Sequence, residues 1–189
     1  MSPASTPSNR DEIVAQLFRL FRCGGYEGVS VGDVSKATGL GKSSLYHYFP
    51  GGKADMATAV VSFARDWIKA HIVDPLGDAG VPLDARIDAM LTAARDLYDG
   101  GTSPCLVASM LVTPDGTTPE GNAGVILSDW IEALSKALQA NGVDAAEADA
   151  RAIAALVRIE GSLLVARATG NLAVFETALE ETRNALIEK

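Results

Sequence analysis

Residues 30–49, SVGDVSKATGLGKSSLYHYF, contain two helical patterns with a very short connection between them. In the first pattern, apolar residues recur at every third position from Val31 to Ala37, which is helical rather than strand spacing. Gly39 ends this pattern because glycine tolerates the left-handed conformation that closes a helix. The second pattern begins at Lys42. Two helices joined this tightly predict a helix-turn-helix arrangement.

The same stretch also contains Gly41-Lys42-Ser43, which matches the end of the phosphate-binding loop G-x-x-x-x-G-K-[ST]. That loop needs a further glycine five residues before Gly41, so that bare backbone amides can surround the phosphates. Position 36 is instead Lys36, and the preceding residues have helical rather than strand spacing. The sequence therefore argues against a nucleotide-hydrolysing enzyme.

The rest of the chain continues in helical patterns separated by glycine and proline breaks, and no strand pattern is visible. Expected helices cover residues 9–23, 30–38, 42–48, 53–72, 83–98, 105–112, 119–140, 144–169 and 172–187. We predict an all-α protein of about nine helices. A Ser/Pro-rich tail at residues 1–8 precedes a three-helix helix-turn-helix domain at 9–53. The helix at 53–72 connects this domain to a larger helical domain at 54–189.

Charge is divided unevenly between these parts. The whole chain has a formal net charge of −8. Residues 1–53 contain six basic and four acidic residues, a net +2, whereas residues 54–189 carry −10. A local basic region matters more for nucleic-acid binding than the total charge. Any DNA-binding surface is therefore expected at the N-terminal end.

Several protein classes are disfavoured by composition. The two cysteines, Cys23 and Cys105, form no C-x-x-C pair, which suits a reducing cytoplasm. The first residues contain no apolar leader, and the most apolar run, 150–168, carries four charges, so we expect no membrane segment. With only His47 and His71, no metal-ligand spacing or catalytic constellation is visible. We expect a cytoplasmic protein without cofactor or metal that is not an enzyme.

At the helix-turn-helix the sequence resembles the TetR family of transcriptional regulators, and its LmrA/YxaF-type branch in particular. The resemblance rests on the letters GYEGVSV at 25–31, on Val34 and ATGL at 37–40, and on LYHYF at 45–49 with FPGGK at 49–53. SPCL at 103–106 adds to the likeness with the branch. The first 55 residues carry most of it.

The resemblance implies that the second helix of the motif lies in the major groove of an operator. Small hydroxyl side chains let that helix approach base edges, while lysines neutralise phosphates. Leu45 and Phe49 would anchor it in the core, although spacing alone requires only that one or two of the aromatic residues at 46–49 face inward. The expected DNA-binding residues are Ser30, Lys42, Ser43, Ser44, Tyr46, His47, Tyr48 and Lys53.

For the larger domain, the resemblance implies a ligand cavity and a homodimer formed by the last two helices. Candidate pocket residues are Trp67, Met90, Tyr98, Cys105, Met110, Trp130, Arg158 and Glu160. Apolar residues in 152–164 are too numerous for one buried face, which independently favours a dimer surface. The expected interface residues are Leu156, Gly161, Leu163, Leu164, Phe175, Leu179 and Leu186. Pairing of Arg158 and Glu160 at the dimer interface is an open alternative to ligand contact.

These features predict a ligand-responsive regulator. We expect a repressor that binds a palindromic double-stranded DNA operator as a homodimer and is released by a small-molecule inducer, with no membrane partner. Two alternatives stay open: a helical interaction or scaffold protein with a degenerate DNA-binding head, and a redox or electrophile sensor that uses Cys105. The identities of inducer and operator are not encoded in any motif.

Overall fold

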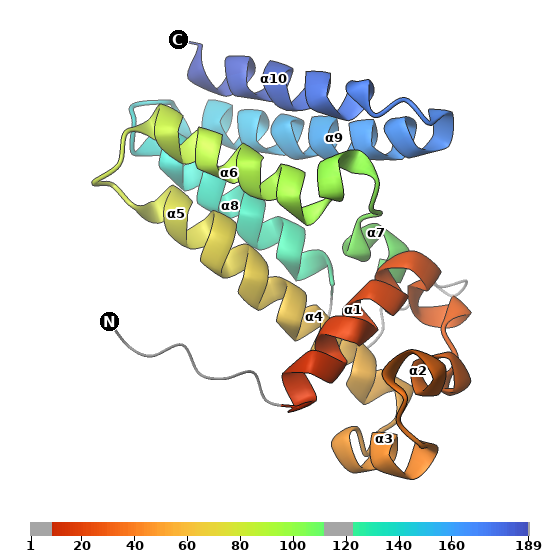
Figure 1. Ribbon diagram of the computed structural model, residues 1–189. Helices are drawn as coiled ribbons and strands as arrows, with labels where there is room; N and C mark the ends of the chain where they lie inside the picture. The colour runs from red at the N-terminus through yellow and green to blue at the C-terminus, as the bar shows by residue number, and fades with distance from the viewer. Residues whose placement is uncertain (1–8, 112–122, 189) are drawn as a thin grey trace. The chain divides into compact units, whose positions relative to one another are not determined.

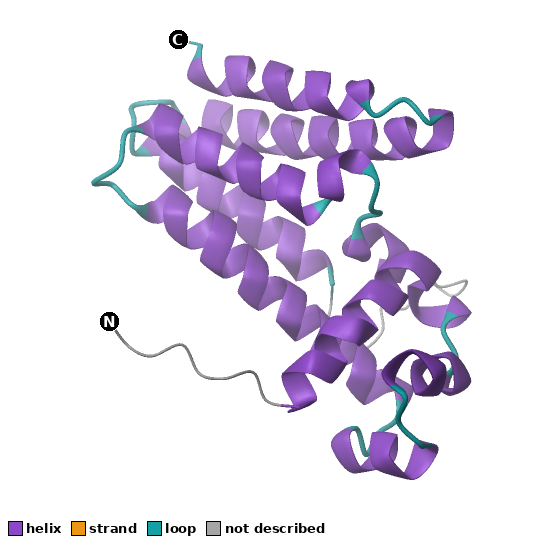
Figure 2. Ribbon diagram, viewed as in Figure 1, coloured by secondary structure: helices purple, strands orange, loops and turns teal. Residues whose placement is uncertain are grey.

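The computed structural model describes residues 9–111 and 123–188, and regular structure in this part of the chain is helical throughout (Figures 1 and 2). Its helices are α1 (Asn9–Gly28), α2 (Val31–Thr38), α3 (Lys42–Tyr48), α4 (Lys53–Ile68), α5 (Asp74–Gly77), α6 (Leu83–Leu97), α7 (Leu106–Leu111), α8 (Gly124–Gln139), α9 (Ala145–Thr169) and α10 (Ala173–Ile187). A π-helical turn, η1 (Lys69–Val73), joins α4 to α5, and a 3-10 turn, η2 (Asp99–Gly101), follows α6. The all-α prediction is confirmed, and the expected tail at 1–8 lies outside the described residues.

Two predicted helices differ in detail from the structure. The expected helix at 53–72 is divided, because its regular α-helical bonding gives way to the wider π turn at Lys69–Val73. Helix α1 extends to Gly28, but its backbone is not helical at Gly25, where φ is 68°. A Cβ at Gly25 would lie 2.8 Å from the carbonyl oxygen of Ser109. This position therefore needs glycine both for its backbone conformation and for the close approach of α7.

The described residues form two compact units. The first contains residues 9–64, 106–111 and 123. In it α1 packs against α7, and the Ser109 hydroxyl donates a hydrogen bond to the carbonyl of Arg22 at 2.7 Å. Phe18 and Phe63 meet edge to face at 5.6 Å between ring centroids. The core is completed by Leu17, Phe21, Val34, Leu45, Phe49, Met56 and Val60, all of which are buried.

The second unit contains residues 65–105 and 124–188. Its long helix α9 packs against both α8 and α10, and Figure 1 shows α9 and α10 running side by side in opposite directions. Trp130 of α8, Ile159 of α9 and Phe175 of α10 are fully buried at the centre. None of the described helices combines the length and the apolar character needed to cross a membrane.

Candidate functional site

The helix-turn-helix begins with a capping box at the start of α2. The Ser30 hydroxyl accepts a hydrogen bond from the backbone N–H of Asp33, and the Asp33 carboxylate accepts one from the backbone N–H of Ser30. Hydrogen bonds from Ser30 hold the pKa of Asp33 below its ordinary value. The cap therefore uses the Ser30 hydroxyl and leaves a carboxylate at the start of α2. Both features favour a structural role for Ser30 over the expected phosphate contact.

The turn between α2 and α3 is closed by side chains of α2. Gly39 takes a φ of 69°, the left-handed conformation that ends α2. The Ser35 hydroxyl donates to the carbonyl of Leu40 at 2.6 Å, and the Thr38 hydroxyl accepts from the backbone N–H of Leu40 at 3.3 Å. These bonds satisfy backbone groups that the end of α2 would otherwise leave unpaired. The start of α3 is thus fixed by the residues just before it.

Helix α3 separates its side chains into an anchored side and an exposed side. Leu45 and Phe49 are buried, as the family resemblance implied for the two anchors. The expected DNA-binding residues Lys42, Ser43, Ser44, Tyr46 and His47 are exposed, and Tyr48 is half-buried. A surface hollow of about 400 Å³ is lined by Leu40, Ser43, Ser44, His47 and Tyr48. Small hydroxyls beside an imidazole give this face donors and acceptors of the kind that read base edges.

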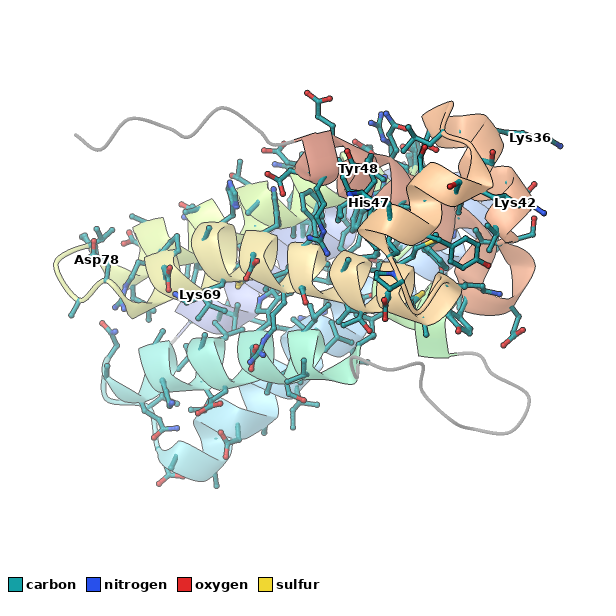
Figure 3. The ribbon with its side chains drawn as sticks, turned by 90° about the horizontal axis from the view of Figure 1, so that it is seen from below. Lys36, Lys42, His47, Tyr48, Lys69 and Asp78 are labelled. Atoms are coloured by element: carbon teal, nitrogen blue, oxygen red, sulfur yellow. The ribbon has the colours of Figure 1, made fainter. Side chains whose placement is uncertain are left out.

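Two exposed lysines lie on α2 and α3 close to the turn between these helices. Lys42 begins α3, and Lys36 lies in the last turn of α2. Figure 3 shows both extending outward from the α2–α3 pair, with His47 and Tyr48 on the other side of α3. Sequence reasoning did not select Lys36. The available signal was its offset from Val34, the buried residue of α2, which places Lys36 on the solvent side of that helix.

Lys53 stands at the first position of α4, as expected, but it has a partner within the chain. Its Nζ lies 4.4 Å from the centroid of the Tyr26 ring, and the lysine is half-buried. A cation over an aromatic face is held by about 0.5–1 kcal/mol at exposed sites. The ring therefore orients the ammonium without neutralising its charge, which leaves Lys53 able to bind a phosphate.

In the second unit, the structure brings together three of the predicted pocket residues. The Tyr98 hydroxyl donates a hydrogen bond to Glu160 Oε1 at 2.5 Å, and the Cys105 thiol bonds the same carboxylate. Desolvation raises the pKa of Glu160, and burial raises the pKa of Tyr98 well above its ordinary value. The Tyr98 ring also meets Phe175 edge to face at 6.0 Å. We call Tyr98, Cys105 and Glu160 the carboxylate cluster.

The other predicted pocket residues are dispersed. Met90 and Trp130 are buried in the second unit, whereas Met110 is buried in the first. The indole N–H of Trp130 has no hydrogen-bond partner among the described residues. Trp67 is half-buried and stacks on His71 at 4.3 Å, instead of entering the core. Arg158 lies 3.9 Å from Glu181 and is not paired with Glu160.

The expected dimer interface needs correction. Leu156, Leu163, Phe175, Leu179 and Leu186 are all buried within the single chain, so they have almost no area left to bury against a partner. They are core residues because α9 already packs against α8 and α10. Gly161 and Leu164 are exposed as expected. The exposed large apolar residues of α9 are Ile153, Val157, Leu164 and Val165, which are 47–69% exposed, and we call them the α9 stripe.

Among the described residues, no group of three or more histidine, cysteine, aspartate or glutamate side chains is arranged to hold a metal ion. The candidate site is therefore the exposed face of α3 with its flanking lysines, and the second unit adds a buried polar cluster and an apolar surface stripe.

Comparison with known proteins agrees with this arrangement. Residues 13–60 match the family model described as bacterial regulatory proteins, tetR family. Residues 82–181 match the model described as transcriptional regulator LmrA/YxaF-like, C-terminal domain, which is more than half of the chain. Both describe regulatory proteins, in agreement with the expectation that the chain is not an enzyme.

Individual relatives extend the likeness over nearly the full length. An HTH-type transcriptional regulator of Mycobacterium tuberculosis is 25% identical over 187 residues, covering 94% of each chain. LmrA of Bacillus subtilis is 36% identical over 66 residues, or 35% of each chain. The crystal structure of a TetR transcriptional regulator from Legionella pneumophila has a TM-score of 0.82 at 25% identity and covers 97% of each chain. The chain belongs to the TetR family of transcriptional regulators and has an LmrA/YxaF-like C-terminal domain.

Proposed function

We propose that the protein is a ligand-responsive repressor that binds a palindromic operator as a homodimer. The observation that carries the proposal is the exposed face of α3, where Ser43, Ser44 and His47 line a hollow, together with the exposed Lys42 at the start of the same helix. In a helix-turn-helix, the recognition helix places such residues against base edges in the major groove. A bacterial regulator of this kind meets its operator in the cytoplasm, where we place it.

The α9 stripe supports the dimer. Val157 and Leu164 are 66% and 69% exposed, values that are costly for large apolar side chains on a monomer surface. Gly161 lies between them in sequence, and a Cβ added there would have no neighbour within 4 Å, so a second helix can approach closely at this point. A two-fold interface on α9 would present two copies of α3 to two half-sites about one DNA turn, or a multiple, apart.

Release by an inducer requires that the ligand bind one conformation better than the other. Helix α4 is continuous from Lys53 in the first unit to Ile68 in the second, so it is the element through which a ligand in the second unit would act on α3. We propose that α4 tilts on ligand binding and changes the separation of the two α3 helices.

The test is a gel-shift titration with a fragment carrying the promoter of the protein's own gene, at several salt concentrations. We expect specific binding whose affinity falls steeply with salt, because Lys42 and Lys53 displace counterions from phosphates. Ser43→Ala combined with His47→Ala should abolish preference for the fragment over random DNA of equal length. Equal binding of both DNAs by the unmodified protein would instead support a scaffold with a degenerate head.

The redox alternative places its chemistry on Cys105. This thiol is only 6% exposed and is hydrogen-bonded to Glu160. An oxidant has little access to such a position, and redox-sensing cysteines are typically accessible. Burial of the thiol thus gives the repressor proposal more support than the sensor proposal.

A further inference from the structure

The second unit also contains a cleft. None of the residues that line it belongs to the carboxylate cluster or to the α9 stripe. It has a volume of about 680 Å³ and lies between the end of α4, η1 and α5 on one side and α8 on the other. Figure 3 labels Lys69, which lines the cleft on its η1 side. A volume of this size is within the range of small-molecule sites in proteins. The cleft is formed by residues of the second unit alone.

The cleft contains a buried cation, Arg86 of α6. Its side chain is 5% exposed, and Nη1 donates a hydrogen bond to the carbonyl of Leu76 at 2.8 Å, which caps the end of α5. The Nε atom is buried and has no hydrogen-bond partner among the described residues. A guanidinium has five N–H donors and cannot lose its charge. The bond to Leu76 therefore leaves both the charge and a buried donor uncompensated.

The other cations of the cleft are already engaged with carboxylates. Arg65 binds Asp129 at 2.7 Å, and Lys136 binds Glu132 at 2.5 Å. Lys69 is paired in the same way with Asp74, at 2.6 Å. In contrast, within the described part of the chain no carboxylate lies at ion-pair distance from Arg86. Buried charges in proteins are normally paired, so an anion from outside the chain is the natural complement.

Apart from these charged residues and the exposed Asp66, the lining consists of apolar residues and one glycine. Ile68, Leu76 and Ala137 are buried, and Val73 and Ala133 are half-buried along the same cleft. The π turn that contributes Lys69 and Val73 is a type of distortion that occurs frequently at functional sites. An inorganic anion would use Arg86 but would leave these side chains in contact with water. The lining therefore suits a ligand with one negative group and an apolar body.

We propose that this cleft binds a small organic monocarboxylate, with the carboxylate on the Arg86 guanidinium and the apolar body against Ile68, Val73 and Ala133. The proposal rests on the ligand-sensing role proposed above and names the chemical class of the ligand. Binding of the carboxylate to the cleft can be measured without DNA. Failure of either can therefore be distinguished from failure of the other. Arg86 is suited to the role because its planar fork matches the two oxygens of a carboxylate.

The test is isothermal titration of the full-length protein with octanoate, decanoate and naphthoate, each compared with its primary amide, and with octylamine and inorganic phosphate. We expect at least one carboxylate to bind at least tenfold more tightly than its amide, and octylamine and phosphate to bind more weakly still. Arg86→Gln should weaken that carboxylate at least tenfold, whereas Arg151→Gln, which removes a charge outside the cleft, should leave it unchanged.

Loss of the bond to Leu76 could destabilise the Arg86→Gln protein, so a second variant keeps the arginine. Ala133→Trp should fill the cleft and block carboxylate binding while the circular dichroism spectrum and melting temperature stay close to those of the unmodified protein. Equal binding of acids and amides would overturn the proposal, as would tighter binding of octylamine or phosphate, or no binding by any carboxylate. Unchanged carboxylate affinity in a folded Arg86→Gln or Ala133→Trp protein would also overturn it.

Discussion

The two units use charged and apolar side chains in opposite ways. In the first unit, Lys36 and Lys42 are exposed beside α3, and Lys53 rests on an aromatic ring that leaves its charge intact. In the second unit, arginines of α6 and α10 are bound to carboxylates: Arg95 to Glu176 and Arg183 to Asp88. Conversely, Leu45 of α3 and Phe49 just after it are covered, whereas large aliphatic side chains are exposed along α9.

This difference indicates what each surface can bind. A lysine whose charge is not neutralised within the chain gains most from a phosphate, whereas an arginine already bound to a carboxylate gains little. An exposed apolar stripe gains from another apolar surface. The first unit is thus suited to DNA and α9 to a second copy of the chain. Arg86 is the exception in the second unit, since it is a buried cation whose hydrogen-bond partner among the described residues is a carbonyl, and that is why we assign it a ligand.

The largest expected effect comes from two separate variants of α9, one with a charge on its exposed side and one with a charge on its buried side. Val157→Asp should produce a folded monomer, because an unpaired charge in an apolar interface costs several kcal/mol. Leu163→Asp should unfold the second unit, because Leu163 is 2% exposed within one chain. Sedimentation equilibrium and circular dichroism measure the two outcomes, with Ala89→Asp on the exposed side of α6 as the control. A wild-type monomer at micromolar concentration would remove the basis for a two-half-site operator.

The second prediction concerns the lysines of the first unit. Lys42→Ala and Lys53→Ala should each reduce the slope of log affinity against log salt by about one, and weaken all DNA sequences about equally. Lys69→Ala, in the second unit, should leave the slope unchanged because Asp74 already pairs with Lys69. If Lys53→Ala changed sequence preference while the slope stayed constant, Lys53 would be a base-reading residue instead.

The sequence predicted the α3 face far better than the second unit, for a physical reason. Residues 42–48 form a single short helix that the family resemblance covers residue by residue, so the resemblance already implied a core position for Leu45 and DNA-facing positions for Lys42 and Ser43. The carboxylate cluster joins Tyr98 at the end of α6, Cys105 just before α7, and Glu160 in α9. No local sequence pattern shows that Tyr98 contacts Glu160. The assignment of Leu163 to a dimer surface failed because periodicity identifies apolar residues but not which neighbour covers them.

The third prediction uses pH to examine the buried acid of the second unit. The folded-state pKa of Glu160 is raised above its ordinary value of 4.5, mainly by desolvation. The folded protein therefore holds this proton more tightly than the unfolded chain does, and stability falls as pH rises from 4.5 through the folded pKa. Glu160→Gln removes this dependence while its side-chain carbonyl still accepts from the Tyr98 hydroxyl.

Urea unfolding at a series of pH values measures the effect as a difference between Glu160→Gln and the unmodified protein. The difference should grow in favour of the variant as pH rises and then level off above the folded pKa. Other titrating groups, including Asp33 with its lowered pKa, are common to both proteins and cancel. Glu180→Gln, which alters an exposed carboxylate of α10, should show no such rise. A constant difference across the range would mean that Glu160 titrates normally.

The smallest effect concerns the turn that presents α3. Gly39 has a φ of 69° and no atom within 4 Å of the position a Cβ would take, so Gly39→Ala should cost stability through backbone strain alone, by about 1 kcal/mol. Gly39→Asn should recover part of this, since asparagine tolerates the left-handed region better. Gly28→Ala is the matched control, because Gly28 also has open space but no positive φ. Thermal unfolding of the four proteins gives the stabilities.

The same substitution also tests what positions the recognition helix. Because the strain lies at the end of α2, the Gly39→Ala protein should lose affinity for its operator relative to Gly28→Ala, with an unchanged salt slope. Equal stability of the Gly39→Ala and Gly39→Asn proteins would show that the backbone at this turn relaxes. In that case α3 would be positioned by the buried Leu45 and Phe49 rather than by the turn, and the face that reads DNA would depend on the core of the first unit alone.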